Sequence, residues 1–300
     1  MIAVLGSINL DFVASSTRLP VPGETIGGSL FEVSPGGKGA NQALASNRAG
    51  AEVLMAGAVG IDDHGGAALH NLIAAGVNIS HVARKGAATG VASIFVAEKG
   101  DNMIISIPGA NYRVGSDDVD RLVEKLSAGD HLVLQLEIPA STVEYALKVA
   151  KWRGIKTLLN TAPFTIDAVR LSKLADIVVM NESEMAEAAR LTETADGDVQ
   201  AAFRALFCED EKLLVVTKGE AGAIACDGKS ILSVAALPIK PVDTVGAGDT
   251  FVGYLAAGLH ARLPINTALQ QAVVAASLAC TKRGAQSGIP FAEEVRGASL

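Results

Sequence analysis

Short apolar runs alternate along the chain with longer stretches in which small and apolar residues recur at helical spacing. The apolar runs lie at residues 2–5, 53–58, 131–136, 157–160, 177–180 and 213–217, and the helical stretches at 41–49, 65–75, 141–151, 182–191 and 199–207. Strands that are apolar at every position and separated by helices indicate a mostly parallel sheet covered on both faces. The pattern therefore predicts a three-layer α/β sandwich.

Two segments, about residues 12–33 and 89–107, break this alternation because they are strand-like and contain no helix. The second predicts a hairpin with strands at 91–97 and 103–107 and a turn at 98–102. Paired with each other, the two segments would form a small β-sheet lid standing off the main body. An edge extension of the main sheet explains the same pattern equally well. We expect residues 1–300 to form a single domain that includes these segments.

Composition narrows the class of protein. Apolar residues make up 49% of the 300 positions and charged residues 19%, which is typical of a folded globular chain. The net charge of −7 argues against nucleic acid as a partner, although backbone N–H groups can still bind phosphate locally.

Location follows from what the chain lacks. No apolar run approaches the ~18–20 residues that span a bilayer, and the first residues lack a basic leader, so we expect a cytoplasmic protein with no membrane contact. Cys208, Cys226 and Cys280 show no close pairing, which fits small buried residues in a reducing compartment.

The sharpest motif is Val-Asp-Thr-Val-Gly-Ala-Gly-Asp-Thr-Phe at residues 242–251, followed by helical spacing. Gly246, Ala247 and Gly248 would form the first turn of a helix, where small residues leave backbone N–H groups open to an anion. Asp249 at this end has two explanations. It caps the helix, or it accepts a proton from a hydroxyl group next to a bound phosphate. The motif alone favours the cap.

Two motifs resemble one known family. Residues 243–251 resemble the C-terminal signature of the ribokinase-like carbohydrate kinases, and Gly-Gly-Lys-Gly-Ala-Asn-Gln-Ala at 36–43 resembles their N-terminal signature. The resemblance covers residues 6 to about 290. It implies the ribokinase-like sandwich and ATP-dependent phosphorylation of a sugar's primary hydroxyl, with Asp249 as the base. The N–H groups of Gly246, Ala247 and Gly248 would stabilise the transferring phosphoryl group.

The Lys-Gly-Ala-Asn form of the first motif is typical of family members that phosphorylate D-ribose to ribose 5-phosphate. Deoxyribose, fructose, a keto-sugar acid or a nucleoside stay open as substrates. A non-catalytic sugar-binding regulator is a further alternative, which an assay of ATP consumption would distinguish. A dinucleotide-dependent oxidoreductase is disfavoured, because Gly-Ser-Ile-Asn-Leu-Asp at residues 6–11 lacks the G-x-G-x-x-G fingerprint.

Several polar residues follow predicted strands, where the carboxyl ends of a parallel sheet meet ligand. For the sugar, the resemblance implies contacts from Asn9, Asp11, Gly37, Lys38, Asn41 and Glu137. Residues 6–11 also suit an ordinary turn and cap, and Lys38 also suits a solvated surface charge.

For the nucleotide, the resemblance implies contacts from Asn181, Thr217 and Gly219, and a Mg²⁺ ion held by Glu184 through water. An acidic helix start and a plain tight turn explain these segments as well. Val273 stands where some members have a histidine beside the adenine, so we expect the base pocket to differ in detail.

The resemblance also implies a K⁺ ion near the anion-binding turn. The ligand positions match Asp243, Val245, Ala279, Lys282 and Gly284, mostly through backbone carbonyls. Gly288 departs from the serine that is usual at its position, and the neighbouring Ser287 is a candidate to compensate. By analogy with the same family, we expect a homodimer formed through the lid.

Overall fold

The computed structural model describes residues 1–98, 101–194, 197–207 and 212–298. Its main sheet has nine strands in the order β13 (Ile231–Val234), β12 (Ala223–Cys226), β11 (Leu213–Thr217), β10 (Ile177–Asn181), β9 (Lys156–Asn160), β8 (His131–Leu134), β1 (Ile2–Leu5), β4 (Val53–Gly60) and β5 (Asn78–Lys85). The strands from β11 to β5 are parallel to one another, whereas the pairings of β11 with β12 and of β12 with β13 are antiparallel. The predicted mostly parallel α/β sheet is confirmed.

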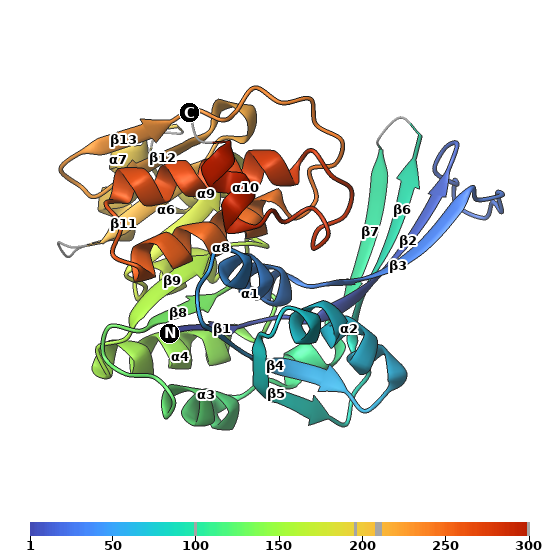
Figure 1. Cartoon of the computed structure of the whole chain (residues 1–300), viewed down its shortest axis with the longest axis horizontal. Helices are drawn as coiled ribbons and strands as arrows, with labels where there is room; N and C mark the ends of the chain where they lie inside the picture. The colour runs from blue at the N-terminus through green and yellow to red at the C-terminus, as the bar shows by residue number, and fades with distance from the viewer. Residues whose placement is uncertain (99–100, 195–196, 208–211, 299–300) are drawn as a thin grey trace.

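Helices cover both faces of this sheet (Figure 1). One face carries α1 (Lys38–Arg48), α2 (Asp63–Ala74), α8 (Ala247–His260), α9 (Ile265–Ala279) and α10 (Ala292–Gly297), and the other carries α3 (Ser116–Val123), α4 (Ala140–Trp152), α5 (Ala168–Ser172), α6 (Glu182–Thr192) and α7 (Val199–Leu206). Alternate side chains of β1 serve the two layers: Ile2 and Val4 join the first core, and Ala3 and Leu5 join the second. Such strands are apolar at every position because both of their faces are buried.

A second, four-stranded sheet projects from the body (Figure 1). Its order is β3 (Leu30–Gly36), β2 (Asn9–Ser16), β6 (Gly90–Ala97) and β7 (Asn102–Ile107). The pairing of β2 with β6 is parallel, and the other two pairings are antiparallel. The two helix-free segments therefore pair as a separate small sheet rather than extending the main one. The sheet starts at Asn9, and its strand β3 ends at Gly36, so it extends beyond the predicted segment 12–33 at both ends. Residues 99–100 of the predicted turn lie outside the described part.

Several elements have no clear sequence pattern. Strand β5 alternates between exposed and half-buried positions, so it contains no apolar run, and β12 and β13 are only four residues each. Strand β8 stops at Leu134, two residues earlier than predicted. Two short 3₁₀ helices, η1 (Gly109–Arg113) and η2 (Gly219–Ala221), complete the described elements.

Two of the cysteines, Cys226 and Cys280, are free thiols, and Cys208 lies outside the described residues. None of the helices in the described ranges combines the length and the hydrophobicity that crossing a bilayer requires.

Small residues bring the two motif helices together. On α8, a Cβ atom at Gly253 would collide with the side chain of Ala45 on α1, and would lie 2.8 Å from the carbonyl oxygen of Gln42. At the other end of α1, a Cβ atom at Gly39 would lie 2.6 Å from the backbone of Gly6, just after β1. Close backbone approach therefore places the starts of α1 and α8 beside the carboxyl ends of the parallel strands, which is where ligands bind in this class of fold.

Candidate active site

Asp249 joins the two sequence motifs. It lies in the first turn of α8 and is only 7% exposed. Its Oδ2 accepts a hydrogen bond from Nδ2 of Asn41 and its Oδ1 accepts one from Nε2 of Gln42, both at 2.9 Å. Two motifs separated by about 200 residues in the chain thus meet at one carboxylate.

The start of α8 is open to a ligand. Gly246 caps the helix in the left-handed region, with φ of 78°, and a Cβ atom there would lie 2.7 Å from Ala285. The N–H of Ala247 donates to the carbonyl of Thr244 at 3.3 Å. The N–H of Gly248 belongs to the first turn, which has no intrahelical acceptor for it. A Cβ atom at Gly248 would meet none of the described residues within 4 Å.

A cavity of about 170 Å³ lies in front of this helix start. Its wall is formed by Lys38, Asn160, Ala162, Val179, Met180, Asn181, Glu184, Thr217, Gly246, Gly248, Asp249 and Val252. Seven of these are predicted site residues, drawn from four separate parts of the chain. Asn160 and Ala162 are additional wall residues that sequence analysis did not name.

Lys38 is the first residue of α1 and is half-buried, so it is not an ordinary solvated charge. The carboxylate of Asp249, and then those of Glu137 and Glu184, raise the pKa of its ammonium group, while burial acts in the opposite direction. The preceding Gly37 has φ of +88°, and a Cβ atom there would lie 2.8 Å from the backbone nitrogen of Asn9. Lys38 therefore brings a firmly held positive charge to the cavity.

Asp11 approaches the cleft from strand β2 of the small sheet. Its carboxylate lies against the Cα of Gly36, where any Cβ atom would collide with it. Within the described residues, its buried Oδ1 has no hydrogen-bond partner. Burial first, and then the charges of Glu137 and Asp249, raise the pKa of Asp11 to about 7. One oxygen of this carboxylate is thus buried without a hydrogen bond among the described residues.

Asn9 and Glu137 flank Asp11 and are held more completely. Oδ1 of Asn9 accepts from Nδ2 of Asn111 at 2.7 Å, and Asn9 is 6% exposed. Oε2 of Glu137 accepts from Oγ of Ser7 at 2.5 Å and from the backbone N–H of Lys38 at 3.2 Å. Ser7, which lies within segment 6–11, and Asn111 are further members of the site that were not named as site residues from the sequence.

Asn181 and Glu184 serve the helix and the cavity together. Oδ1 of Asn181 accepts from the N–H of Glu184 at 2.8 Å, and Oε2 of Glu184 accepts from the N–H of Asn181 at 3.1 Å, which is a capping box. Oγ of Thr161 also donates to Oε2 of Glu184, at 3.0 Å. Asn181 and Glu184 therefore cap the start of α6 and also lie in the cavity wall. Among the described residues, no three histidine, cysteine or acidic side chains gather around a potential metal position.

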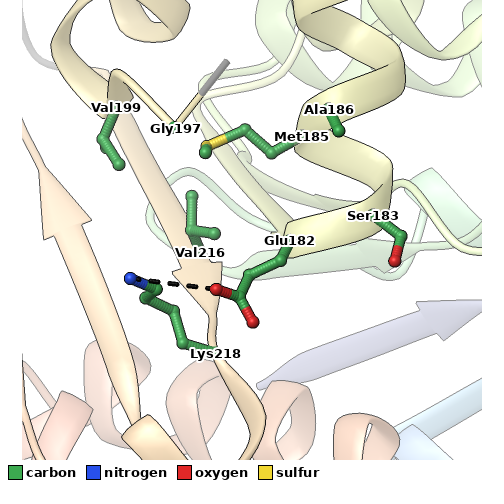
Figure 2. A pocket seen from close by; sticks show the side chains of 8 residues that line it. All are labelled: Glu182, Ser183, Met185, Ala186, Gly197, Val199, Val216 and Lys218. Atoms are coloured by element: carbon green, nitrogen blue, oxygen red, sulfur yellow. Dashed lines mark ion pairs between the residues drawn. The ribbon is translucent and has the colours of Figure 1, made fainter.

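A larger pocket of about 360 Å³ adjoins the end of β11 (Figure 2). It is lined by Glu182, Ser183, Met185, Ala186, Gly197, Val199, Val216 and Lys218. Val216 belongs to the core on the side of α6 and α7, so this pocket lies on the face of the sheet opposite α8. Figure 2 shows Lys218 turned toward Glu182, with Nζ and Oε1 3.8 Å apart. None of the predicted site residues lines it.

Of the remaining nucleotide candidates, Thr217 ends β11 and lines the smaller cavity. Gly219 starts η2 with φ of +52°. Val273 lies on α9, where its side chain is part of the core and is 3% exposed.

The segment around Asp243 is tied to the chain beyond α9. Oδ1 of Asp243 accepts from the N–H of Val245 at 3.0 Å, and its Oδ2 accepts from the N–H of Gly284 at 2.8 Å. Ser287 has its hydroxyl bound elsewhere, donating to the carbonyl of Arg283 at 2.5 Å.

Three backbone carbonyls converge beside Gly288. A Cβ atom there would lie 2.9 Å from the carbonyl oxygens of Ala279 and Gly284, and 3.6 Å from that of Lys282. These are three of the five residues predicted to bind a potassium ion. Such a cluster of carbonyl oxygens is the kind of donor set that suits a hard cation, so the residues fit the ion that the resemblance implies.

Comparisons with known proteins agree with this geometry. The model of the pfkB family carbohydrate kinases matches residues 1–292. A ribokinase of Lactococcus lactis is 38% identical over 296 residues, covering 98% of this chain and 95% of its own. A deoxyribokinase of Salmonella typhi is 35% identical over 296 residues, covering 98% and 96%. The structure of an Arabidopsis thaliana ribokinase complexed with ribose and ATP matches with a TM-score of 0.85 and 28% identity, covering 99% of this chain and 97% of that one.

Proposed function

We propose that this chain, which belongs to the pfkB family of carbohydrate kinases, transfers the γ-phosphoryl group of ATP to the primary hydroxyl of D-ribose and forms ribose 5-phosphate. One observation carries the proposal: Asp249, fixed beside the open start of α8, is close enough to the buried, unsatisfied Asp11 for their charges to interact. A polyol brings the hydroxyl donors that such a carboxylate lacks. The similarity to ribokinases, one of them complexed with ribose and ATP, supports ribose as the sugar.

The chemistry needs little beyond positioning and charge. Asp249 accepts the proton of the sugar hydroxyl while the hydroxyl oxygen forms a bond to the γ-phosphorus. The bond between that phosphorus and the β–γ bridging oxygen of ATP breaks, and ADP leaves. The N–H groups of Gly246, Ala247 and Gly248 at the start of α8 stabilise the charge on the transferring group, and the ammonium group of Lys38 adds to this stabilisation. The sugar is held in place by Asn9, Asp11, Gly37, Lys38, Asn41 and Glu137.

Nucleotide and ions occupy the other half of the cleft in this proposal. Asn181, Thr217 and Gly219 contact ATP, and Glu184, in the cavity wall, holds Mg²⁺ through water. Mg²⁺ neutralises phosphate charge. The carbonyl oxygens beside Gly288, with Asp243 and Val245, hold K⁺, which supplies a fixed positive charge near the anion-binding turn. The free thiols of Cys226 and Cys280 support work in the reducing cytoplasm.

The small sheet acts as a lid and, on this proposal, as a dimer interface. The strand registers place six apolar side chains on the face away from Asp11, all at least 42% exposed: Phe31, Val33, Phe95, Met103, Ile105 and Ile107. An apolar face of this kind is unusual on a monomer surface, and a second copy of the same sheet would cover it.

Light scattering on paired variants tests the dimer. Ile105 and Ile104 are neighbours on β7, 62% and 56% exposed, and they point to opposite faces. Ile105→Lys is expected to give monomers, because it places a charge in the apolar face. Ile104→Lys is the matched control and should stay dimeric. A parent protein that is monomeric at working concentration would refute the interface.

A sugar panel tests the reaction. Purified protein with ATP and Mg²⁺ is assayed for ADP release with ribose, 2-deoxyribose, fructose, a keto-sugar acid and a nucleoside, each with and without K⁺. Ribose should give the highest kcat/KM, and ³¹P NMR should place the phosphate on the primary carbon. Deoxyribose is the second candidate because of the deoxyribokinase relative. If no substrate in the panel leads to ATP consumption, a non-catalytic sugar-binding protein is favoured.

A further inference from the structure

Both hydrogen bonds to Asp249 come from side-chain amides of helix α1. Asn41 donates to one carboxylate oxygen and Gln42 to the other. A primary amide has a donating NH₂ end and an accepting oxygen end, and a rotation of 180° exchanges them. Turned around, either amide would set its oxygen against the carboxylate, which is repulsive in a buried site. The base therefore depends on how these two amides are oriented.

Two further glutamines bind the oxygen ends of the same amides. Nε2 of Gln286 donates to Oδ1 of Asn41 at 3.0 Å, and Nε2 of Gln135 donates to Oε1 of Gln42 at 2.7 Å. Gln286 and Gln135 are 3% and 0% exposed, so water does not compete for these bonds. With its oxygen already bound, each inner amide presents only its NH₂ group to Asp249.

The network continues outward with consistent polarity. Oε1 of Gln286 accepts from Nδ2 of Asn71 on α2, at 2.9 Å, which fixes the orientation of Gln286 in turn. The second N–H of Gln42 donates to Oδ1 of Asn160 at 3.0 Å. Buried amide networks of this kind are rigid when donors and acceptors match along their length.

We propose that Gln286 and Gln135 are positioning residues of the phosphoryl transfer, which keep Asn41 and Gln42 turned with their NH₂ groups toward Asp249. This inference rests on the proposed function, because it takes Asp249 as the base. Neither glutamine lines the cavity in front of α8, so neither meets the substrate there. Their effect reaches the sugar hydroxyl through the carboxylate that the inner amides hold.

Gln135 separates positioning from ordinary structural support. Its Oε1 is buried and has no partner among the described residues, and it lies against the Cα of Gly6. A buried acceptor without a donor costs stability. Gln135→Met keeps the length of the side chain and removes both this oxygen and the donor to Gln42. Positioning therefore predicts a slower enzyme that is at least as stable as the parent.

The experiment compares Gln135→Met and Gln286→Met with Ser46→Ala. Ser46 is buried on the same helix, and its hydroxyl lies 2.9 Å from the carbonyl oxygen of Gln42 and 3.1 Å from that of Gly253. Its loss breaks buried hydrogen bonds but leaves the amide side chains in place. In both glutamine variants, kcat with ribose should fall roughly 5–30-fold. The KM for ATP should stay within about twofold, and Ser46→Ala should keep the parent kcat.

Double variants supply the decisive comparison. Because each glutamine acts through an inner amide, Gln286→Met in an Asn41→Ala background should lower kcat by less than about twofold further. An equal loss in both backgrounds, or a parent-like kcat in both glutamine variants, overturns the proposal. If Gln286→Met does not fold, Gln135→Met in a Gln42→Ala background carries the same test. If Asp249→Asn instead keeps the activity of the parent protein, the proposed function itself is refuted.

Discussion

Two of the carboxylates around the cleft are held in opposite ways, one on the main body and one on the small sheet. On the body, Asp249 has an amide donor on each oxygen. On strand β2 of the small sheet, Asp11 has a buried oxygen without a hydrogen-bond partner in the described part of the chain, and the pKa of Asp11 is raised to about 7. The protein thus orients the proposed base before any substrate arrives, whereas it leaves the proposed sugar ligand to be completed by the sugar. Asp249 has to be oriented for proton transfer, whereas Asp11 has to keep an oxygen available for the sugar.

Removing the charge of Asp249 should have the largest effect on turnover. Asp249→Asn keeps the shape of the side chain but cannot accept the hydroxyl proton, so we expect kcat to fall by ~10²–10⁴ with folding retained. Steady-state kinetics with ribose and a thermal melt check this. Unchanged turnover would remove Asp249 from the mechanism.

The second prediction concerns the carboxylate that the sugar completes. Asp11→Asn weakens charge-assisted hydrogen bonds to the sugar, so kcat/KM for ribose should fall roughly 10–100-fold while the KM for ATP changes little. Asp101→Asn is the matched control, because Asp101 is an exposed acid at the start of the lid hairpin's second half. Equal losses for ribose and ATP would mean that Asp11 does not act on the sugar.

A glycine substitution can move the same carboxylate without changing its charge. A side chain at Gly36 would collide with the carboxylate of Asp11, so Gly36→Ala should lower kcat/KM for ribose by roughly 5–10-fold. Gly27→Ala is the control, since a Cβ atom there would have no neighbour within 4 Å in the ranges that the structure describes. Parent-like kinetics in both variants would show that Asp11 can shift without consequence.

The smallest expected effect is on stability. Because the pKa of Asp11 is raised from 3.8 to about 7, the folded chain holds this proton more tightly than the unfolded chain. Its contribution to stability therefore falls as pH rises from about 4 to about 7. Asp11→Asn should raise the Tm of the sugar-free protein by a few degrees at pH 8, and by less at pH 5. A gain that is larger at pH 5 would contradict the raised pKa.

The sequence indicated the residues that line the cavity better than the buried residues behind them. Gly246, Asp249 and Lys38 lie in contiguous motifs, where small residues next to a helix start have a direct physical meaning. Gln135 and Gln286 lie far apart in the chain and carry no charge, so nothing local connects them to Asp249. One signal was available: Gln135 is a polar residue inside an apolar run, and such a residue needs a buried partner.

The fold shows the same division. Strands buried on both faces, such as β1 and β10, stand out as apolar runs, and their parallel order follows from the intervening helices. The half-exposed β5 does not stand out, because its exposed and half-buried positions alternate and it contains no apolar run. The pairing of β2 with β6 was open for a similar reason, since a separate sheet and an extended edge share one pattern.

The chain passes from β1 into the lid with only residues 6–8 between Leu5 and Asn9. Asn9 and Asp11 are the first and third residues of β2, so they lie where the small sheet joins the body. Eight residues of strand reach about 26 Å at ~3.3 Å per residue. If the small sheet closes as the proposed lid, a small shift of these two side chains on binding a ligand would therefore be amplified at the far ends of the strands, where Figure 1 shows the sheet farthest from the body.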